Sequence, residues 1–437
     1  MKKPFLAVLV PSFLLLLASC VSPNPSSSSS SSISSEPGSS SSSSSSSSSI
    51  SSSSSSISST PLHPERISLP DVPKPTYESW LEVSALEMAG QYGDCTLYNY
   101  HYGDNSFDLL VDAGPQINSY TPAENRDGLI ALLKEKVSDH VLDMIVLSHQ
   151  HGDHYGGLHD GTLQEAGITM VSTIVDNGVS FSYGDYHTIW EQGVRDYWTK
   201  RGGKYYPVQS LLAAGEGEQG ALFTIDPLAF VLFLDTGKYP SVGSSGSNDN
   251  PNKDSVAMSI HFGKYDFVTL GDLATSEVEL SFSKLNMTPS REPWFSPAGS
   301  EIIFKANHHG SAANTTNTTG LLDFLKPSYS WASSAMVEGN QAKIANRIRQ
   351  HPHDTIASRL AFYTGKAHGN ENSVDYFFWN GTMGTIHFTI ASIDAEVSIK
   401  GIGRNQATYY SKDLELVDPE SEKNLPYFKT AFAQKSS

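Results

Sequence analysis

A short segment with three histidines and one aspartate follows an apolar stretch of strand length. The apolar stretch is 144–147, and the segment reads Ser148-His149-Gln150-His151-Gly152-Asp153-His154. Alternate residues of an extended segment project to the same side, so His149 and His151 can point together, while Asp153 and His154 come just past the turn. Imidazole nitrogen and carboxylate oxygen are ligands that zinc prefers. The segment therefore predicts a metal site at the end of a buried strand.

Apolar runs of strand length alternate with Gly-, Asn- and Asp-rich breaks and with helical patterns along the chain after residue 62. Strands and helices interspersed in this way predict layered α/β packing. The expected strands are 96–100, 108–111, 144–148, 168–175, 230–234, 256–262, 266–270 and 301–305. The expected helices are 127–135, 274–285 and 341–350.

The pattern His-x-His-x-Asp-His resembles the metallo-β-lactamase superfamily, and three further motifs follow that family's order. They are Asp112-Ala113-Gly114 before it, and Gly271-Asp272 and His308-His309-Gly310-Ser311 after it, each closing an apolar strand. The resemblance implies an αββα sandwich that uses two divalent metal ions, zinc first and manganese second. It places Asp112 as a supporting residue behind the metals.

By the same resemblance, site residues are carried over motif by motif. Which of His308 and His309 binds metal, the other contacting substrate, is left open. The implied metal ligands are His149, His151, Asp153, His154, Asp272, His308, His309 and Asp254, and the implied catalytic residues are Asp272, Asp153, His309 and His351.

Within the superfamily, the chain resembles the extracellular hydrolase domain of ComEC-type DNA-uptake proteins. The features shared are Gly93-Asp94, Asn252-x-Asp254-Ser255, the double histidine and His351-Pro352. Many relatives carry a third histidine for the first metal site between the first motif and the bridging aspartate, and no obvious one occurs here. The ComEC-type pattern implies that Asp254 or Asn252 takes that place.

The N-terminus predicts export. Two lysines precede an apolar run over 5–18 that is too short to span a bilayer as a helix, which favours a signal segment over 1–20. Its end, Leu17-Ala18-Ser19-Cys20, resembles a lipobox, which implies lipidation of Cys20. Residues 21–61 are almost entirely serine and are predicted to be a disordered tether. Residues 62–432 are predicted to be the hydrolase domain, on the extracellular face of the cell membrane.

The formal net charge of −17 argues against a stable nucleic-acid partner held by a broad basic face. It leaves room for an enzyme that cleaves phosphodiester bonds with metals. The resemblance favours such a substrate, either a small molecule or a polymer such as nucleic acid or phosphorylcholine-bearing surface polymer. Two alternatives remain: a lactonase or β-lactamase, and a non-catalytic surface-binding lipoprotein on the same scaffold. The sequence does not predict an oligomeric state.

Overall fold

The structure is a computed structural model that describes residues 76–88, 92–114, 124–180, 185–213, 222–234, 236, 239, 251–273, 300–312, 316–334 and 351–402. All of them belong to one unit that begins at Thr60. The predicted signal segment 1–20 with Cys20, the predicted linker 21–61, and the predicted helices 274–285 and 341–350 lie outside the described residues. None of the described helices has the length and apolar character needed to cross a membrane.

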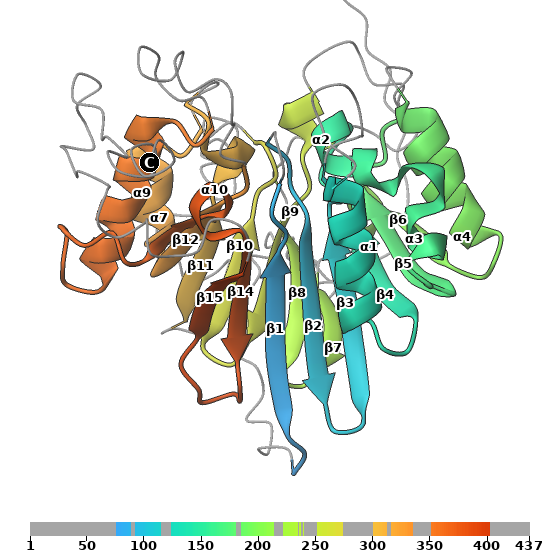
Figure 1. The fold of residues 1–437 in the computed structure, drawn as a ribbon, viewed down its shortest axis with the longest axis horizontal. Helices are drawn as coiled ribbons and strands as arrows, with labels where there is room; N and C mark the ends of the chain where they lie inside the picture. Colours follow the sequence, from blue (N-terminus) through green and yellow to red (C-terminus); the bar gives the residue numbers. More distant parts are fainter. Residues whose placement is uncertain are drawn as a thin grey trace, which may run out of the picture. The chain divides into compact units, whose positions relative to one another are not determined.

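Two β-sheets are formed by the described residues (Figure 1). The first has the order β15-β14-β1-β2-β3-β4-β5-β6, and the second has the order β13-β12-β11-β10-β9-β8-β7. The strands of the first are β1 (Ser79–Ala85), β2 (Thr96–Tyr102), β3 (Asn105–Val111), β4 (Val141–Val146), β5 (Met170–Asp176), β6 (Lys204–Pro207), β14 (Thr385–Ile390) and β15 (Ser398–Ile402). Those of the second are β7 (Leu222–Asp226), β8 (Ala229–Leu234), β9 (Ala257–Phe262), β10 (Tyr265–Thr269), β11 (Glu301–Lys305), β12 (Tyr329–Ala332) and β13 (Phe377–Trp379).

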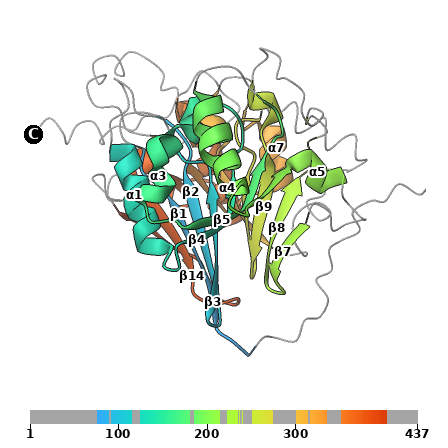
Figure 2. The same ribbon diagram turned by 90° about the vertical axis from the view of Figure 1, so that its right-hand side faces the viewer.

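Helices cover the outer faces of both sheets, as the two views in Figures 1 and 2 show. On the first sheet lie α1 (Glu124–Lys136), α2 (Gly152–Tyr155), η1 (Gly156–Gly161), α3 (Thr162–Glu165), the π-helix η2 (His187–Asp196) and α4 (Tyr197–Thr199). On the second lie α7 (Thr319–Leu325) and α9 (Asp354–Ala367). The other described helices are α5 (Val208–Ala213), η4 (Pro251–Asp254), η5 (Asn307–Gly310) and α10 (Asn380–Met383).

Three separate apolar cores show that the unit has four layers. Alternate strand residues point to opposite faces of a sheet, so Leu109 joins the core between the two sheets while Leu110 joins the core under α1. In β10, Phe267 likewise faces the core between the sheets and Val268 faces the core under α7 and α9. The predicted αββα sandwich is confirmed.

The eight expected strands are all present, with ends that differ by a few residues, and the expected helix 127–135 lies within α1. Strand β4 ends at Val146, two residues earlier than expected, although the amide of Leu147 still donates to Val175 O at 2.9 Å. Strands β1, β6, β7 and β12 to β15, and helix α9, were not predicted.

The ends of strands from both sheets meet at one edge of the sandwich. Strand β3 is parallel to β4 in the first sheet, and β10 is parallel to β11 in the second, so the segments that follow these strands emerge together. The edge is tied across the sheets by the amide of Val256, which donates to Ser148 O at 2.8 Å. Within the second sheet, the amide of His308 donates to Gly271 O at 3.2 Å. All four sequence motifs lie along this edge.

Candidate metal centre

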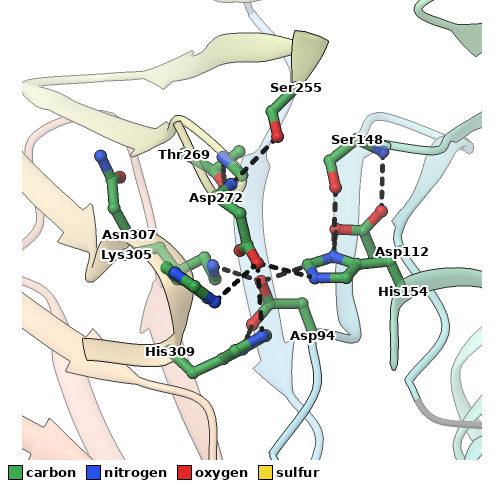
Figure 3. Close-up of polar contacts among 12 residues, drawn as sticks. Asp94, Asp112, Ser148, His154, Ser255, Thr269, Asp272, Lys305, Asn307 and His309 are labelled. Atoms are coloured by element: carbon green, nitrogen blue, oxygen red, sulfur yellow. Dashed lines mark hydrogen bonds and ion pairs between the residues drawn. The ribbon is translucent and has the colours of Figure 1, made fainter. Parts of the chain in front are cut away.

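One carboxylate oxygen lies at the middle of the edge. Asp272, which follows β10, is 1% exposed, and its backbone amide donates to Ser255 Oγ at 3.1 Å (Figure 3). Four imidazole Nε2 atoms surround its Oδ2 atom, at 3.5 Å for His154 and at 3.7 Å for His149, His308 and His309. None of the four forms a hydrogen bond with this carboxylate, and neither of its oxygens has any other hydrogen-bond partner among the described residues.

These separations fit a bound cation better than a hydrogen-bonded cluster. Zinc bonds of about 2.0–2.2 Å at tetrahedral angles hold two ligand atoms roughly 3.3–3.6 Å apart. A buried carboxylate without a hydrogen bond is costly unless a cation pairs with it. His154 Nε2 is also buried without a hydrogen bond. The residues present therefore fit a divalent metal ion.

The donors fall into two groups that share Asp272. His149 and His151 form one group with it, and His149 Nε2 lies 3.0 Å from His151 Nδ1. His154 and His309 form the other. Asp153 Oδ2 adjoins this second group, at 3.1 Å from His309 Nε2 and 3.9 Å from His154 Nε2. The cluster can thus hold metal ions.

Oxygen atoms behind three of the imidazoles hold their Nδ1 atoms. His154 Nδ1 donates to Asp112 Oδ2 at 2.9 Å, and the other oxygen of Asp112 accepts from the amide of Ser148 at 2.7 Å. His149 Nδ1 lies 3.0 Å from Ser148 Oγ, and His309 Nδ1 donates to Asp94 Oδ1 at 3.2 Å. Because a carboxylate can only accept, the Nδ1 atoms of His154 and His309 each carry a proton, and the Nε2 atoms of both rings face Asp272.

The loop that carries the double histidine has an unusual backbone. His308 (φ 49°, ψ 49°) and His309 (φ 53°, ψ 22°) both adopt the left-handed conformation, which costs a non-glycine residue on the order of 1–3 kcal/mol. Gly310 follows at φ 80°, and a Cβ there would lie 2.7 Å from Pro352 Cβ. Strain of this kind concentrates at functional sites, where the surrounding packing enforces it.

The electrostatics of the cluster favour cations. Burial opposes ionisation of Asp272, but His154, His309 and His149 outweigh it and hold the pKa of this carboxyl well below its usual range. Burial also opposes protonation of His309, but Asp94 and Asp272 outweigh it and raise its pKa to about 9. Protons on His154 and His309 thus take the place that a metal ion would fill, and metal binding would release them.

Neutral rings line the outer side of the centre. Burial lowers the pKa of His308 and, together with His309 and His308, lowers the pKa of His351 to about 3. The ring of Tyr92, which is 37% exposed, stacks on His351 with centroids 4.2 Å apart and lies 5.3 Å from the ring of His309. These three side chains, Tyr92, His308 and His351, form the mouth of the centre.

The structure brings together the predicted residues His149, His151, Asp153, His154, Asp272, His308 and His309, and it places Asp112 behind His154 as expected. Asp254, the last residue of η4, belongs to neither donor group, and its backbone carbonyl accepts from Asn177 Nδ2. His187 pairs with Glu191 on η2, and His261 pairs with Asp266 between β9 and β10, so neither supplies a third histidine. Asp94 was not predicted as a site residue.

A four-layer α/β sandwich whose edge carries a His/Asp cluster able to hold metal ions suggests a metallohydrolase. The sequence profile of the metallo-beta-lactamase superfamily matches residues 90–329, which is more than half of the chain. The chain belongs to this superfamily, as the sequence motifs predicted, and this membership supports a hydrolase. The match does not extend to the narrower ComEC-type resemblance.

Two solved structures are similar to parts of the chain. One is an N-acyl homoserine lactone hydrolase with its product N-hexanoyl-L-homoserine bound at the catalytic metal centre, at 13% identity and a TM-score of 0.24, covering 48% of this chain and 87% of that one. The other comes from work on indirect contributions of mutations to the optimisation of a new enzyme function, at 12% identity, a TM-score of 0.22, and 48% and 86% coverage. These scores are too low to bear on the substrate. No curated protein matches the chain.

Proposed function

We propose that the chain is a surface-anchored hydrolase of phosphodiester bonds that works with two divalent metal ions, with zinc as the first candidate. The observation that supports it most is the carboxylate of Asp272 with four Nε2 atoms at 3.5–3.7 Å and no hydrogen bond. His149 and His151 would hold one ion, and His154, His309 and Asp153 the other, with Asp272 between them. Ions held by these residues would supply the Lewis acidity that makes a water molecule nucleophilic near neutral pH.

The choice of a phosphodiester as substrate rests on the formal charge of the centre and on the composition of the first donor group. Asp94, Asp112, Asp153 and Asp272 contribute four negative charges, and the buried Lys305 contributes one positive charge. With two divalent ions and a neutral water molecule the centre would carry a formal charge of about +1, which suits an anionic phosphodiester. Among the described residues, the first group also lacks the third histidine that lactone- and β-lactam-cleaving relatives usually carry. His308 would donate a hydrogen bond to the substrate at the mouth.

A panel of substrates tests this proposal. The full-length chain in detergent, loaded with zinc or manganese, is assayed on bis(p-nitrophenyl) phosphate, p-nitrophenyl phosphorylcholine, single-stranded DNA, N-hexanoyl homoserine lactone and nitrocefin. We expect metal-dependent turnover of at least one phosphodiester, and a loss of 10³-fold or more in kcat/KM for Asp272→Asn. Turnover of the lactone or nitrocefin alone would overturn the choice of substrate. A stable chain that binds no metal would favour the surface-binding alternative.

Anchoring is a separate part of the proposal. If Cys20 carries the lipid, Cys20→Ala should release the chain from the membrane fraction into the medium or the soluble exported fraction, with its metal content unchanged. Retention of this variant in the membrane fraction would contradict a lipid anchor at this position.

A further inference from the structure

Asp94 is a buried carboxylate at the centre that no sequence motif assigned to a role. It precedes β2 and is 2% exposed. Its amide donates to Asp153 O at 3.1 Å, and its carbonyl accepts from the amide of Gly114 at 2.6 Å. The backbone of Asp94 is therefore fixed between the histidine motif and the end of β3, so its side chain is held in a set place.

The side chain of Asp94 faces the back of the same rings whose front faces Asp272. Its Oδ1 accepts from His309 Nδ1 at 3.2 Å, and its Oδ2 lies 3.8 Å from His154 Nδ1. Asp272 Oδ2 instead faces the Nε2 atoms of both rings. Asp94 lies close enough to be grouped with the metal donors by distance alone, but its orientation is that of a residue that holds ligands.

Lys305, the last residue of β11, is the ion-pair partner of Asp94 (Figure 3). The pair is almost completely buried, at 2% and 3% exposure. A buried ammonium group is rarely retained without a specific partner, and a buried ion pair often contributes little net stability. Lys305 also begins the turn that leads into η5 and the two histidines. The position of Lys305 therefore indicates a role in the metal centre and not in the stability of the fold.

We propose that Asp94 and Lys305 form a positioning pair that fixes the ring and the tautomer of His309, and so sets the affinity of the second donor group for its ion. Asp94 holds the proton of His309 on Nδ1, which leaves Nε2 to bind metal. Lys305 acts through Asp94 by fixing the orientation of the carboxylate and offsetting its charge. This inference rests on the proposed metal binding.

Zinc titrations of full-length variants test it. Partners of this kind typically change metal affinity by about 10–100-fold. We expect Asp94→Asn to weaken one of two zinc sites by that factor and to leave the other within about threefold of wild type. Lys305→Met should weaken the same site. The double variant Asp94→Asn/Lys305→Met removes both buried charges, so it leaves no unpaired buried charge that could unfold the chain. It should bind zinc no more weakly than Asp94→Asn alone.

Cobalt substitution separates positioning from direct ligation. At saturating cobalt, the absorption bands of Asp94→Asn should match those of wild type in position and intensity, because the ligand set is unchanged. A change in coordination would mean that Asp94 binds the ion directly and would overturn the proposal. Wild-type zinc affinity in both Asp94→Asn and the double variant would also overturn the proposal. The same holds if the loss of zinc affinity in the double variant equals the sum of the losses in the two single variants. Failure of wild type itself to bind metal would instead defeat the proposed function.

A matched control exists outside the centre. His261 Nδ1 and Asp266 Oδ1 form a buried pair at 3.0 Å between β9 and β10. Asp266 lies six residues before Asp272, roughly 20 Å along an extended chain. Asp266→Asn removes the same kind of charge from the same kind of pair, and it should leave both zinc affinities as in wild type.

Discussion

His308 and His309 are adjacent in the chain but occupy different environments. The side chain of His309 is fully buried, and its Nδ1 is held by Asp94. The side chain of His308 is 17% exposed, and its Nδ1 has no hydrogen-bond partner among the described residues. A ligand whose second nitrogen is held is the better metal ligand. The environments favour His309 as the ligand and His308 as the residue that contacts substrate.

Single substitutions at the two histidines should therefore have different effects, one on metal content and the other on kcat. His309→Ala should lose one metal ion per chain, measured by elemental analysis. His308→Ala should keep both ions and lower kcat by about 10²–10³, because it removes one hydrogen-bond donor from the reacting centre. Wild-type kcat in His308→Ala, or loss of an ion from it, would reverse the two assignments.

Most of the metal-donor residues could be predicted from the sequence, but the residues that hydrogen-bond to them could not. His149, His151, Asp153 and His154 lie within six residues, so local spacing was enough to find them. The contact between His309 and Asp94 joins positions 215 residues apart, and only the pairing of strands and loops from both sheets creates it. Gly93-Asp94 belongs to the ComEC-type pattern, but a dipeptide does not show which ring its carboxylate faces.

At the scale of elements, the end of β3 and the helix η1 pack without space for a side chain. A Cβ added at Gly157 would lie 2.0 Å from Ala113 O, directly after Asp112. Gly157→Ala should force the two segments apart, lower stability by about 1–3 kcal/mol, and weaken zinc binding through the displacement of Asp112. Thermal melting and zinc titration measure the two effects.

Gly128 in α1 supplies the control for this substitution. A Cβ there would meet only the side chain of Leu86, at 3.6 Å, and alanine favours a helix by up to about 1 kcal/mol over glycine. Gly128→Ala should melt at or above the wild-type temperature and bind zinc normally. If Gly157→Ala has the melting temperature and the zinc affinity of wild type, the backbone near Ala113 can move away from the added Cβ without cost.

A cross-strand pair in β2 and β3 makes stability depend on pH. Asp108 is 1% exposed, Asn99 Nδ2 donates to its Oδ1 at 2.6 Å, and its Oδ2 has no hydrogen-bond partner among the described residues. Burial raises the pKa of Asp108 to about 7; Asn99 opposes the rise, and Asp143 adds to it. The native state then holds this proton more tightly than the unfolded chain, whose aspartates titrate near 4. Stability from this group is complete below pH 4 and is lost as pH rises through 7.

Asp108→Asn keeps the shape of the protonated side chain without the charge. We expect it to raise the free energy of unfolding by about 1–3 kcal/mol at pH 8 and to change it little at pH 4. Denaturant melts at the two pH values measure this. A variant that is equally destabilised at both would show that the ionised carboxylate is accommodated in the native state.

Strands in long apolar runs were predictable, and the missed strands were missed for different physical reasons. Strand β1 carries Glu82 and Ser84 within its span, and β12 and β13 have only four and three residues, too few to show a period. Strand β14 alternates buried and half-buried residues in full, so its pattern was present in the sequence. It pairs with β1 across more than 300 positions, which no local signal indicates.

At the scale of the whole molecule, the centre joins the two sheets through side chains that repel one another unless cations lie between them. Asp94, Asp153 and Asp272 come from three separate segments, and the buried Lys305 pairs with Asp94 and lies near Asp272. Any ion that binds only the folded chain adds stability, about 2.7 kcal/mol per site when present at 100 times its Kd. The metal should therefore act as a link between the halves of the sandwich.

Removal of the metal should lower the melting temperature, and the loss should grow with pH. In the metal-free chain the raised pKa of His309, about 9, means that its proton stabilises the fold fully below pH 6.5 and is lost as pH rises through 9. Bound metal replaces that proton, so the loaded chain should lose less stability over this pH range than the metal-free chain. Calorimetry of loaded and chelated full-length protein should show a gap of about 5 °C or more at pH 7 that widens by pH 9.5. Asp272→Asn should show little gap at either pH, and a gap that closes as pH rises would refute the link between these charges and the metal.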